Sequence, residues 1–235
     1  MRGPGMPLWG SAQTKGLAVS PSRRLLPMMV ALVAVAGCAP VKQQRPQPVA
    51  VIASTKADVW KGIASASDQQ RVANVTGAWA AGLAAARRGG FATALRDDQE
   101  LLKTNAALAR PAPTPGSYRC RLVKIGGKPA IEKFKPFFCY VEVDGNLLTI
   151  VKQTGSQRPA GRLWEDDDPT RLVFLGSLAL GDEEAPLAYG DNPRRDMAGI
   201  FERTGPFRWR LVIPWPQDGS KLHAYELTPV ADQPE

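Results

Sequence analysis

The feature that most constrains the fold is a change of period in the apolar residues after Arg110–Ser117 (RPAPTPGS). Three prolines and a glycine in this stretch interrupt helix and strand alike. Beyond it, Tyr118, Cys120 and Leu122 alternate with their neighbours at a period of two, which is typical of half-buried strands. Asp144-Gly145 separates two such segments and predicts a tight hairpin turn.

The same pattern recurs through residues 117–230 and predicts about eight strands. They are expected at 118–123, 138–143, 147–151, 161–164, 171–178, 197–203, 208–214 and 222–227. Many short strands joined by short turns favour a small antiparallel barrel, with a sandwich as the alternative. An eight-stranded barrel encloses an interior that side chains fill or that holds one small ligand.

A helical segment is expected before this β domain, at residues 55–110. Apolar residues follow one another there at steps of three and four, as on one face of a helix: Val72, Val75, Trp79 and Leu83. Ser67 and Gln70 have the spacing of a capping box, and Gly89-Gly90 predicts a stop before a second helix at 92–102. The predicted fold class is α+β, a helical hairpin followed by the β domain.

The N-terminus predicts export. The apolar run Met28–Ala36 follows Arg23-Arg24 and is too short to cross a bilayer, which takes about 20 residues, so it indicates a secretory signal peptide. Val35-Ala36-Gly37-Cys38 resembles the bacterial lipobox, whose cysteine is acylated and becomes the mature N-terminus. We therefore expect residues 1–37 to be a lipoprotein signal peptide and Cys38 to be the lipidation site.

The residues after Cys38 predict an anchored protein that faces the periplasm. Residues 38–54 form a Pro-rich linker between the lipidated cysteine and the folded body, and residues 231–235 form a tail. The expected membrane contact is the lipid anchor. Ala39, rather than Asp, follows the cysteine, which by the sorting rule of enteric bacteria favours the outer over the inner membrane.

Charge excludes nucleic acid as a partner. From Cys38 onward the chain has 26 basic and 22 acidic residues, and from Tyr118 onward it has 16 basic and 17 acidic residues. The predicted β domain is therefore close to neutral, whereas nucleic-acid binding requires a basic patch on the folded body.

Cys120 and Cys139 are predicted to form a disulfide, because an even pair of cysteines in an oxidising compartment is normally bonded. A redox or metal pair is the alternative, but the spacing is far from Cys-x-x-Cys and His223 is the only histidine. We expect no metal and no cofactor.

Known catalytic motifs are missing from the sequence, and we expect a protein that is not an enzyme. It contains no Gly-x-Ser-x-Gly elbow and no phosphate-binding glycine loop.

The acidic run Glu165–Asp168 is interpreted as a solvated turn rather than a calcium site. A carboxylate-dependent hydrolase using Asp196 and Glu202 remains an alternative that needs a defined separation of the two groups.

Two arginine-rich stretches, Thr154–Trp164 and Arg194–Pro216, carry two interpretations. In the first, outward arginines pair with acids and are structural, which is the interpretation we favour. In the second, they meet at one rim of the barrel and grip an anionic ligand. The residues of this possible anion site are Arg158, Arg162, Arg195, Arg203, Arg208 and Arg210.

Several motifs in order carry a family resemblance: PGSYRCRLVKIG, PFFCYVEV, KQTGSQRPAGRL, RLVFLGSLALGDE and YGDNPRRDMAGIFERTGPFRWRLVIPWP. From about Val59 to Pro229 the chain resembles the proteobacterial family catalogued as domain of unknown function 4893, with a departure near PQDGSKLHAYEL. The resemblance implies an envelope protein, usually behind a lipoprotein signal, and implies no activity.

The leading functional hypothesis is a lipid-anchored envelope protein that acts as a non-catalytic binding or structural module, with an envelope protein or an anionic ligand as partner. A periplasmic protease inhibitor-like barrel is an alternative by analogy of fold, and the carboxylate hydrolase is another. A filled barrel interior would weaken both internal ligand binding and catalysis.

Overall fold

The computed structural model describes residues 53–181 and 183–231. The expected lipidation site Cys38, the expected signal peptide, nearly all of the expected linker and residues 232–235 of the expected tail lie outside these residues. The helices of the described part are α1 Lys56–Ile63, α2 Ala66–Ala73, α3 Val75–Arg88, α4 Ala92–Asp97 and α5 Gln99–Leu102. The strands are β1 Gly116–Ile125, β2 Ile131–Lys133, β3 Phe137–Asp144, β4 Leu147–Lys152, β5 Gln157–Glu165, β6 Arg171–Leu180, β7 Asp196–Gly205, β8 Arg208–Pro214 and β9 Leu222–Pro229.

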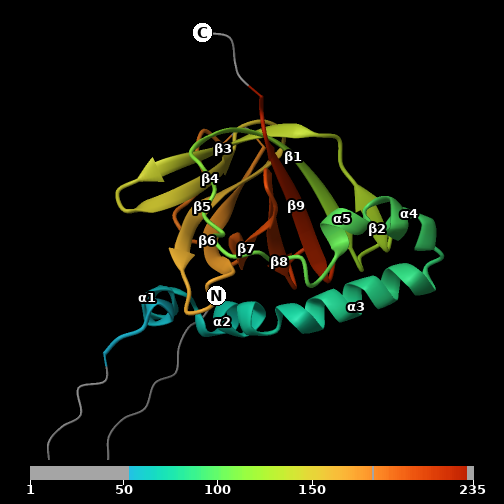
Figure 1. The fold of residues 1–235 in the computed structure, drawn as a ribbon, viewed down its shortest axis with the longest axis horizontal. Coiled ribbons are helices and arrows are strands. Elements are labelled where there is room, and N and C mark those ends of the chain that lie inside the picture. The colour runs from blue at the N-terminus through green and yellow to red at the C-terminus, as the bar shows by residue number, and fades with distance from the viewer. Residues whose placement is uncertain (1–52, 182, 232–235) are drawn as a thin grey trace, which may run out of the picture. The chain divides into compact units, whose positions relative to one another are not determined.

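The strands form a closed antiparallel barrel (Figure 1). Each strand from β3 to β9 pairs with the next along the chain, and β1 pairs with both β3 and β9. Tyr118–Ile125 aligns with Leu222–Pro229 along its whole length, so the barrel has no long open edge. The barrel is confirmed over the sandwich, and the eight predicted strands are present.

The structure also has β2, a strand that the sequence analysis missed. It pairs with Val123–Ile125, beyond the part of β1 that β3 occupies. Three residues are too few to show an alternating pattern. The predicted hairpin turn is confirmed, since β3 and β4 meet around Gly145, which has a φ of 62° that favours glycine.

The barrel interior is filled by side chains. Inward residues from all eight strands form one buried cluster, which includes Tyr118, Phe174, Phe201 and Trp209. A cavity of about 20 Å³ remains inside, next to the disulfide, and this is close to the space of one water molecule. The interior as it stands therefore has no room for a ligand.

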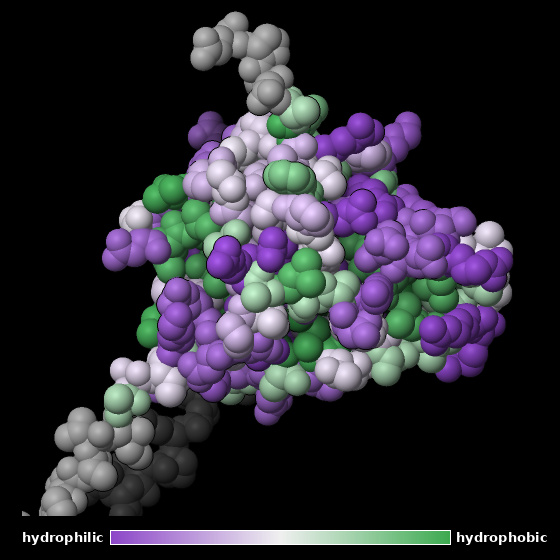
Figure 2. Space-filling model, viewed as in Figure 1, coloured by the Kyte–Doolittle hydropathy of each residue, from purple (hydrophilic) through white to green (hydrophobic). Residues whose placement is uncertain are grey.

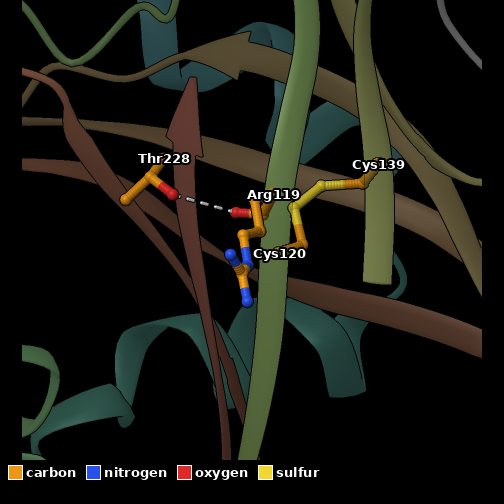
Figure 3. Close-up of a disulfide and its surroundings, with 4 residues drawn as sticks. All are labelled: Arg119, Cys120, Cys139 and Thr228. Carbon is orange, nitrogen blue, oxygen red and sulfur yellow. Dashed lines mark hydrogen bonds between the residues drawn. A yellow bond between two sulfur atoms is a disulfide. The ribbon is translucent and has the colours of Figure 1, made fainter. Parts of the chain in front are cut away.

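The predicted disulfide between Cys120 and Cys139 is present, and it links the neighbouring strands β1 and β3 on the inner side of the barrel (Figure 3). The two Cα atoms are 6.0 Å apart, and both residues are buried. Figure 3 also shows the Thr228 hydroxyl donating a hydrogen bond to the carbonyl oxygen of Arg119, across the β9–β1 pairing that closes the barrel.

The helices cover the outer face of one side of the barrel. Trp60, Val72 and Trp79 belong to a second buried cluster with outward residues of β1, β6, β7, β8 and β9, among them Ile125 and Val212. Helices and barrel therefore share a core and form one compact unit, Val51–Glu235. Figure 2 shows one face of the molecule, with hydrophilic residues over much of it and smaller hydrophobic groups between them.

The helical segment is more divided than the sequence predicts. The first predicted helix is broken at Asn74 into α2 and α3, and α1 was not predicted. The N-cap of α2 is Ser65, whose hydroxyl accepts a hydrogen bond from the Asp68 amide at 3.1 Å. The predicted N-cap, Ser67, is therefore wrong by two residues.

No helix within the described residues is both long and apolar enough to cross a bilayer.

The acidic turn Glu165–Asp168 holds α1 against the barrel. Asp166 is buried, accepts a hydrogen bond from the Trp60 indole at 3.0 Å and pairs with Arg171 at 2.6 Å. Asp167 accepts from the Ala57 amide at the start of α1, at 3.2 Å. The expectation of a solvated turn is wrong for Asp166, because α1, which is distant in sequence, packs against the turn and buries it.

Arg210 on β8 joins the barrel to the helical layer. Its side chain is 0% exposed and binds Glu202 of β7 at 2.5 Å. Another guanidinium nitrogen donates to the carbonyl oxygens of Leu101 and Lys103 at the end of α5, at 2.8 Å each. The guanidinium carbon also lies 5.0 Å from the centre of the Trp79 ring on α3, within the range of a cation–π contact.

We predict that Arg210→Met lowers the free energy of unfolding by about 3–5 kcal/mol, because it leaves Glu202 as a buried charge without its cation. Urea denaturation measures the loss. Adding Glu202→Leu should recover part of it, since the stranded carboxylate is then removed as well.

Arg162→Met is the matched control for this prediction. The Arg162–Asp144 ion pair is about half exposed on both sides, and such pairs contribute about 0–1 kcal/mol. If Arg210→Met and Arg162→Met lower the free energy of unfolding by equal amounts, the anchoring role of Arg210 is contradicted.

Candidate functional site

The six arginines of the possible anion site lie in four separate places. Arg158 and Arg195 come together at the loops after β4 and β6, where both contact Glu183. Arg162 binds Asp144 on the β3–β4 hairpin at 2.6 Å. Arg203 donates to the Ala109 carbonyl oxygen from two nitrogens, at 3.0 and 2.7 Å.

The last two, Arg208 and Arg210, lie beside α5 on the outer face of β8. Arg208 is within 3.4 Å of Glu226 and 3.6 Å of Glu100, and Arg210 is enclosed as described above. Every one of the six thus contacts a carboxylate or a backbone carbonyl oxygen, the arrangement expected for structural arginines.

A different basic site lies at one mouth of the barrel, where β1 and β4 end and β3, β5 and β9 begin. It is an open pocket of about 580 Å³, which we call the mouth pocket. Its lining residues are Leu122, Lys124, Glu132, Phe134, Lys135, Phe137, Lys152, Thr154, Gly155, Ser156, Gln157 and Tyr225. Three lysines and one acid therefore face this space.

Lys152, the last residue of β4, is half-buried in the mouth pocket, whereas Lys135 of the same lining is exposed to solvent. The Lys152 ammonium donates to the Gln157 carbonyl oxygen at 2.8 Å and lies 4.4 Å from the centre of the Phe137 ring. Among the described residues no carboxylate lies within 4.0 Å of it. Burial lowers the pKa of the Lys152 ammonium, and the positive charges of Arg158 and Lys124 lower it further. An anion beside Lys152 would relieve this unfavourable environment.

Lys124, by contrast, is held by a polar cluster behind the pocket. Lys124 and His223 both donate to the same oxygen of Asp218, at 2.8 Å each. The other Asp218 oxygen accepts from the Ser220 hydroxyl at 2.6 Å. Burial alone would raise the pKa of Asp218, but hydrogen bonds from His223, Lys124 and Ser220 hold it well below its usual range.

Tyr225 adds a neutral donor to the mouth pocket. The residue is 7% exposed, and its hydroxyl has no hydrogen-bond partner within residues 53–181 and 183–231. Burial raises the pKa of this hydroxyl and Asp218 raises it further, so the group keeps its proton at physiological pH. A protonated hydroxyl and an ammonium in one pocket are suited to hold an anion.

Arg158 supports the pocket from behind. Its guanidinium donates to the carbonyl oxygens of Gly155, Gly181 and Glu183, and so joins the β4–β5 turn to the loop after β6. Gly155 itself lines the mouth pocket. The sequence analysis named Arg158 as a possible ligand contact and favoured a structural role, and in the structure its donors fix the loop beside the pocket.

The carboxylate pair of the hydrolase alternative does not form a site. Asp196 and Glu202 are six positions apart on β7, which corresponds to about 20 Å along a strand. Glycosidases hold their two carboxyl groups about 5–9.5 Å apart. Glu202 is in addition occupied by Arg210.

A family model described as Domain of unknown function (DUF4893) matches residues 60–227. The chain belongs to the DUF4893 family. The match begins in α1 and ends in β9, so the DUF4893 domain comprises both the helical layer and the barrel. No curated protein and no solved structure matches the chain.

The sequence analysis of this DUF4893 protein missed the lysines of the mouth pocket. Lys124 and Lys152 occupy inward positions of their strands, since they follow Leu122 and Ile150 at a spacing of two. A lysine in phase with core residues was the signal that could have identified them. That the two lie at the same mouth depends on the strand order, which the sequence does not show.

We predict that His223 makes the DUF4893 domain less stable in mild acid. Burial lowers the pKa of His223, while Asp218 opposes this shift. Its Nδ1 atom is buried without a partner among the described residues. The unfolded chain therefore takes up a proton below about pH 6.5 more readily than the folded one, and the free energy of unfolding should fall by up to about 2 kcal/mol between pH 7 and pH 5.

His223→Gln tests this prediction, because glutamine can still donate to Asp218 but does not titrate. His223 is the only histidine of the chain. Urea unfolding at a series of pH values should show a flatter dependence in the variant than in the wild type. If the free energy of unfolding depends on pH in the same way in both proteins, His223 is not the source of the acid sensitivity.

Proposed function

We propose that this DUF4893 protein is a lipid-anchored, non-catalytic binding module of the cell envelope, and that it holds an anionic ligand in the mouth pocket. The observation that carries the proposal is Lys152, a half-buried ammonium without a carboxylate partner in the described part of the chain. A charge in such an environment costs stability unless something compensates it, and an anion bound in the pocket would do so.

The rest of the fold supports binding at the mouth rather than in the interior. The space left inside the barrel is about 20 Å³, against about 580 Å³ in the mouth pocket. Small-molecule sites typically occupy about 300–1,000 Å³. The disulfide next to β4 holds the wall of the pocket, since Cys139 lies opposite Lys152 in the β3–β4 register.

The envelope location rests on the sequence before Ala53. A short apolar run that ends in Val35-Ala36-Gly37-Cys38 supports lipidation. A buried disulfide is in keeping with an oxidising compartment. The sorting rule for Ala39 favours the outer membrane, with the domain facing the periplasm.

Lys152→Met tests the binding proposal. At an acetate concentration ten times its Kd, binding should stabilise the wild type by about 1.4 kcal/mol, which is about 3–6 °C in melting temperature for a domain of this size. Sodium chloride of equal ionic strength serves as the reference. The shift should disappear in Lys152→Met and persist in the control Lys128→Met, whose lysine is exposed and does not line the pocket.

The same comparison with phosphate shows whether the pocket also accepts a polyvalent anion. If neither acetate nor phosphate produces a shift that depends on Lys152, the binding proposal is wrong.

Cys38→Ala tests the anchor. We expect wild-type cells to incorporate radiolabelled palmitate into the protein, and the variant to lose both the label and the membrane association. The melting temperature of the variant's folded domain should not change, because Cys38 precedes the compact unit that starts at Val51. Equal labelling of the two proteins would refute lipidation at this residue.

A further inference from the structure

The mouth pocket is not only basic, because apolar side chains line the part of it next to the lysines. Phe134 is 37% exposed, and Phe137 and Leu122 line the pocket with it. The Lys124 ammonium lies 5.3 Å from the centre of the Phe134 ring, and the Lys152 ammonium lies 4.4 Å from that of Phe137. Each ring thus lies beside an ammonium group.

The charges of the two lysines are compensated to different extents. Asp218 neutralises Lys124 at 2.8 Å, whereas no carboxylate lies within 4.0 Å of Lys152 among the described residues. The third lysine of the lining, Lys135, is exposed to solvent. The half-buried Lys152 ammonium and the Tyr225 hydroxyl are suited to a head group with a single negative charge. The adjacent Phe134, Phe137 and Leu122 are suited to an apolar group attached to that head.

The filled interior sets where such an apolar group can lie. Phe137, Lys152 and Tyr225 line both the mouth pocket and the internal cavity, so they form the partition between the two. Because the cavity has only about 20 Å³, a chain of several carbons does not fit behind this partition. The mouth pocket has the space for it, with Phe134 as the exposed aromatic ring of its lining.

We propose that the ligand of the mouth pocket is an amphiphilic monoanion, such as a short acyl carboxylate, with its head at Lys152 and its apolar part on Phe134. This inference rests on the proposed function, since it specifies the ligand class of the same site. It accounts for two features of one pocket: the Lys152 ammonium without a carboxylate partner among the described residues, and the partly exposed Phe134 ring in the same lining.

The test is a series of straight-chain carboxylates, from acetate through butyrate and hexanoate to octanoate, titrated below their micellar concentrations into the complete domain. Isothermal titration calorimetry gives the Kd of each. In the wild type the affinity should rise with chain length, by up to about fourfold per methylene, the equivalent of about 0.8 kcal/mol for each buried CH₂.

Two variants separate the head from the apolar part. Lys152→Met should weaken all members of the series by a similar factor. Phe134→Ala should leave acetate binding nearly unchanged and reduce the gain per methylene. Phe138→Ala is the matched control, because Phe138 is 52% exposed, next to Phe137 in the chain, and does not line the pocket; it should behave as the wild type.

The outcomes distinguish this inference from the proposed function. If acetate and octanoate bind within threefold of each other and both depend on Lys152, the amphiphile inference fails while anion binding stands. If no member of the series binds and phosphate does not bind either, both fail.

Vesicles distinguish a soluble ligand from a bilayer surface. We expect the unlipidated Cys38→Ala protein to bind octanoate but not to sediment with phosphatidylglycerol vesicles. Sedimentation that depends on Phe134, without binding of any soluble carboxylate, would overturn the inference in favour of a membrane surface.

Discussion

The structure depends on one buried guanidinium. Arg210 is enclosed between the barrel and the helices, with Glu202, two carbonyl oxygens at the end of α5 and the Trp79 ring as its partners. These groups come from β7, α3 and the end of α5, so a single side chain of β8 joins both helices to the sheet. Burial of a charge is unfavourable without such partners, and the arrangement therefore specifies one packing of helices on barrel.

Arg210 is also part of a charge ladder on the outer face of the barrel. In the strand register Arg171 lies opposite Glu202, Glu202 opposite Arg210, Arg210 opposite Glu226, and Glu226 opposite Arg121. Opposite charges in directly paired positions stabilise a sheet by about 0.2–1 kcal/mol each. The ladder sets Arg121, Arg171 and Arg210 opposite acids of neighbouring strands, so these arginines contribute to the structure of the sheet.

Because side chains fill the barrel interior, the surfaces that are left for function are the barrel mouths and the outer face. The apolar interior and the disulfide make the wall rigid, and Lys152 and Tyr225 are fixed at its rim by the strands that carry them. Lys152 follows the inward Ile150, and Tyr225 lies between the buried His223 and Leu227 on the same face of β9. A site built on strands needs little reorganisation when it binds, and this lowers the cost of binding. The DUF4893 family match covers the elements that carry this site.

The sequence by itself determined the local features: strands from the period of two, the turn at Gly145, the disulfide and the α+β order. Each depends on residues close in the chain or on a count of two cysteines. Only the tertiary structure decided that the sheet closes, that its interior is filled, that Arg210 is buried and that Lys124 and Lys152 share one mouth. Closure depends on the β1–β9 pairing, and Lys124 and Lys152 share one mouth because β3 pairs with both β1 and β4. Arg210 is buried because the end of α5 and the Trp79 ring of α3 pack over it. An alternating pattern shows which face of a strand is inward, but it contains no information on which strands become neighbours.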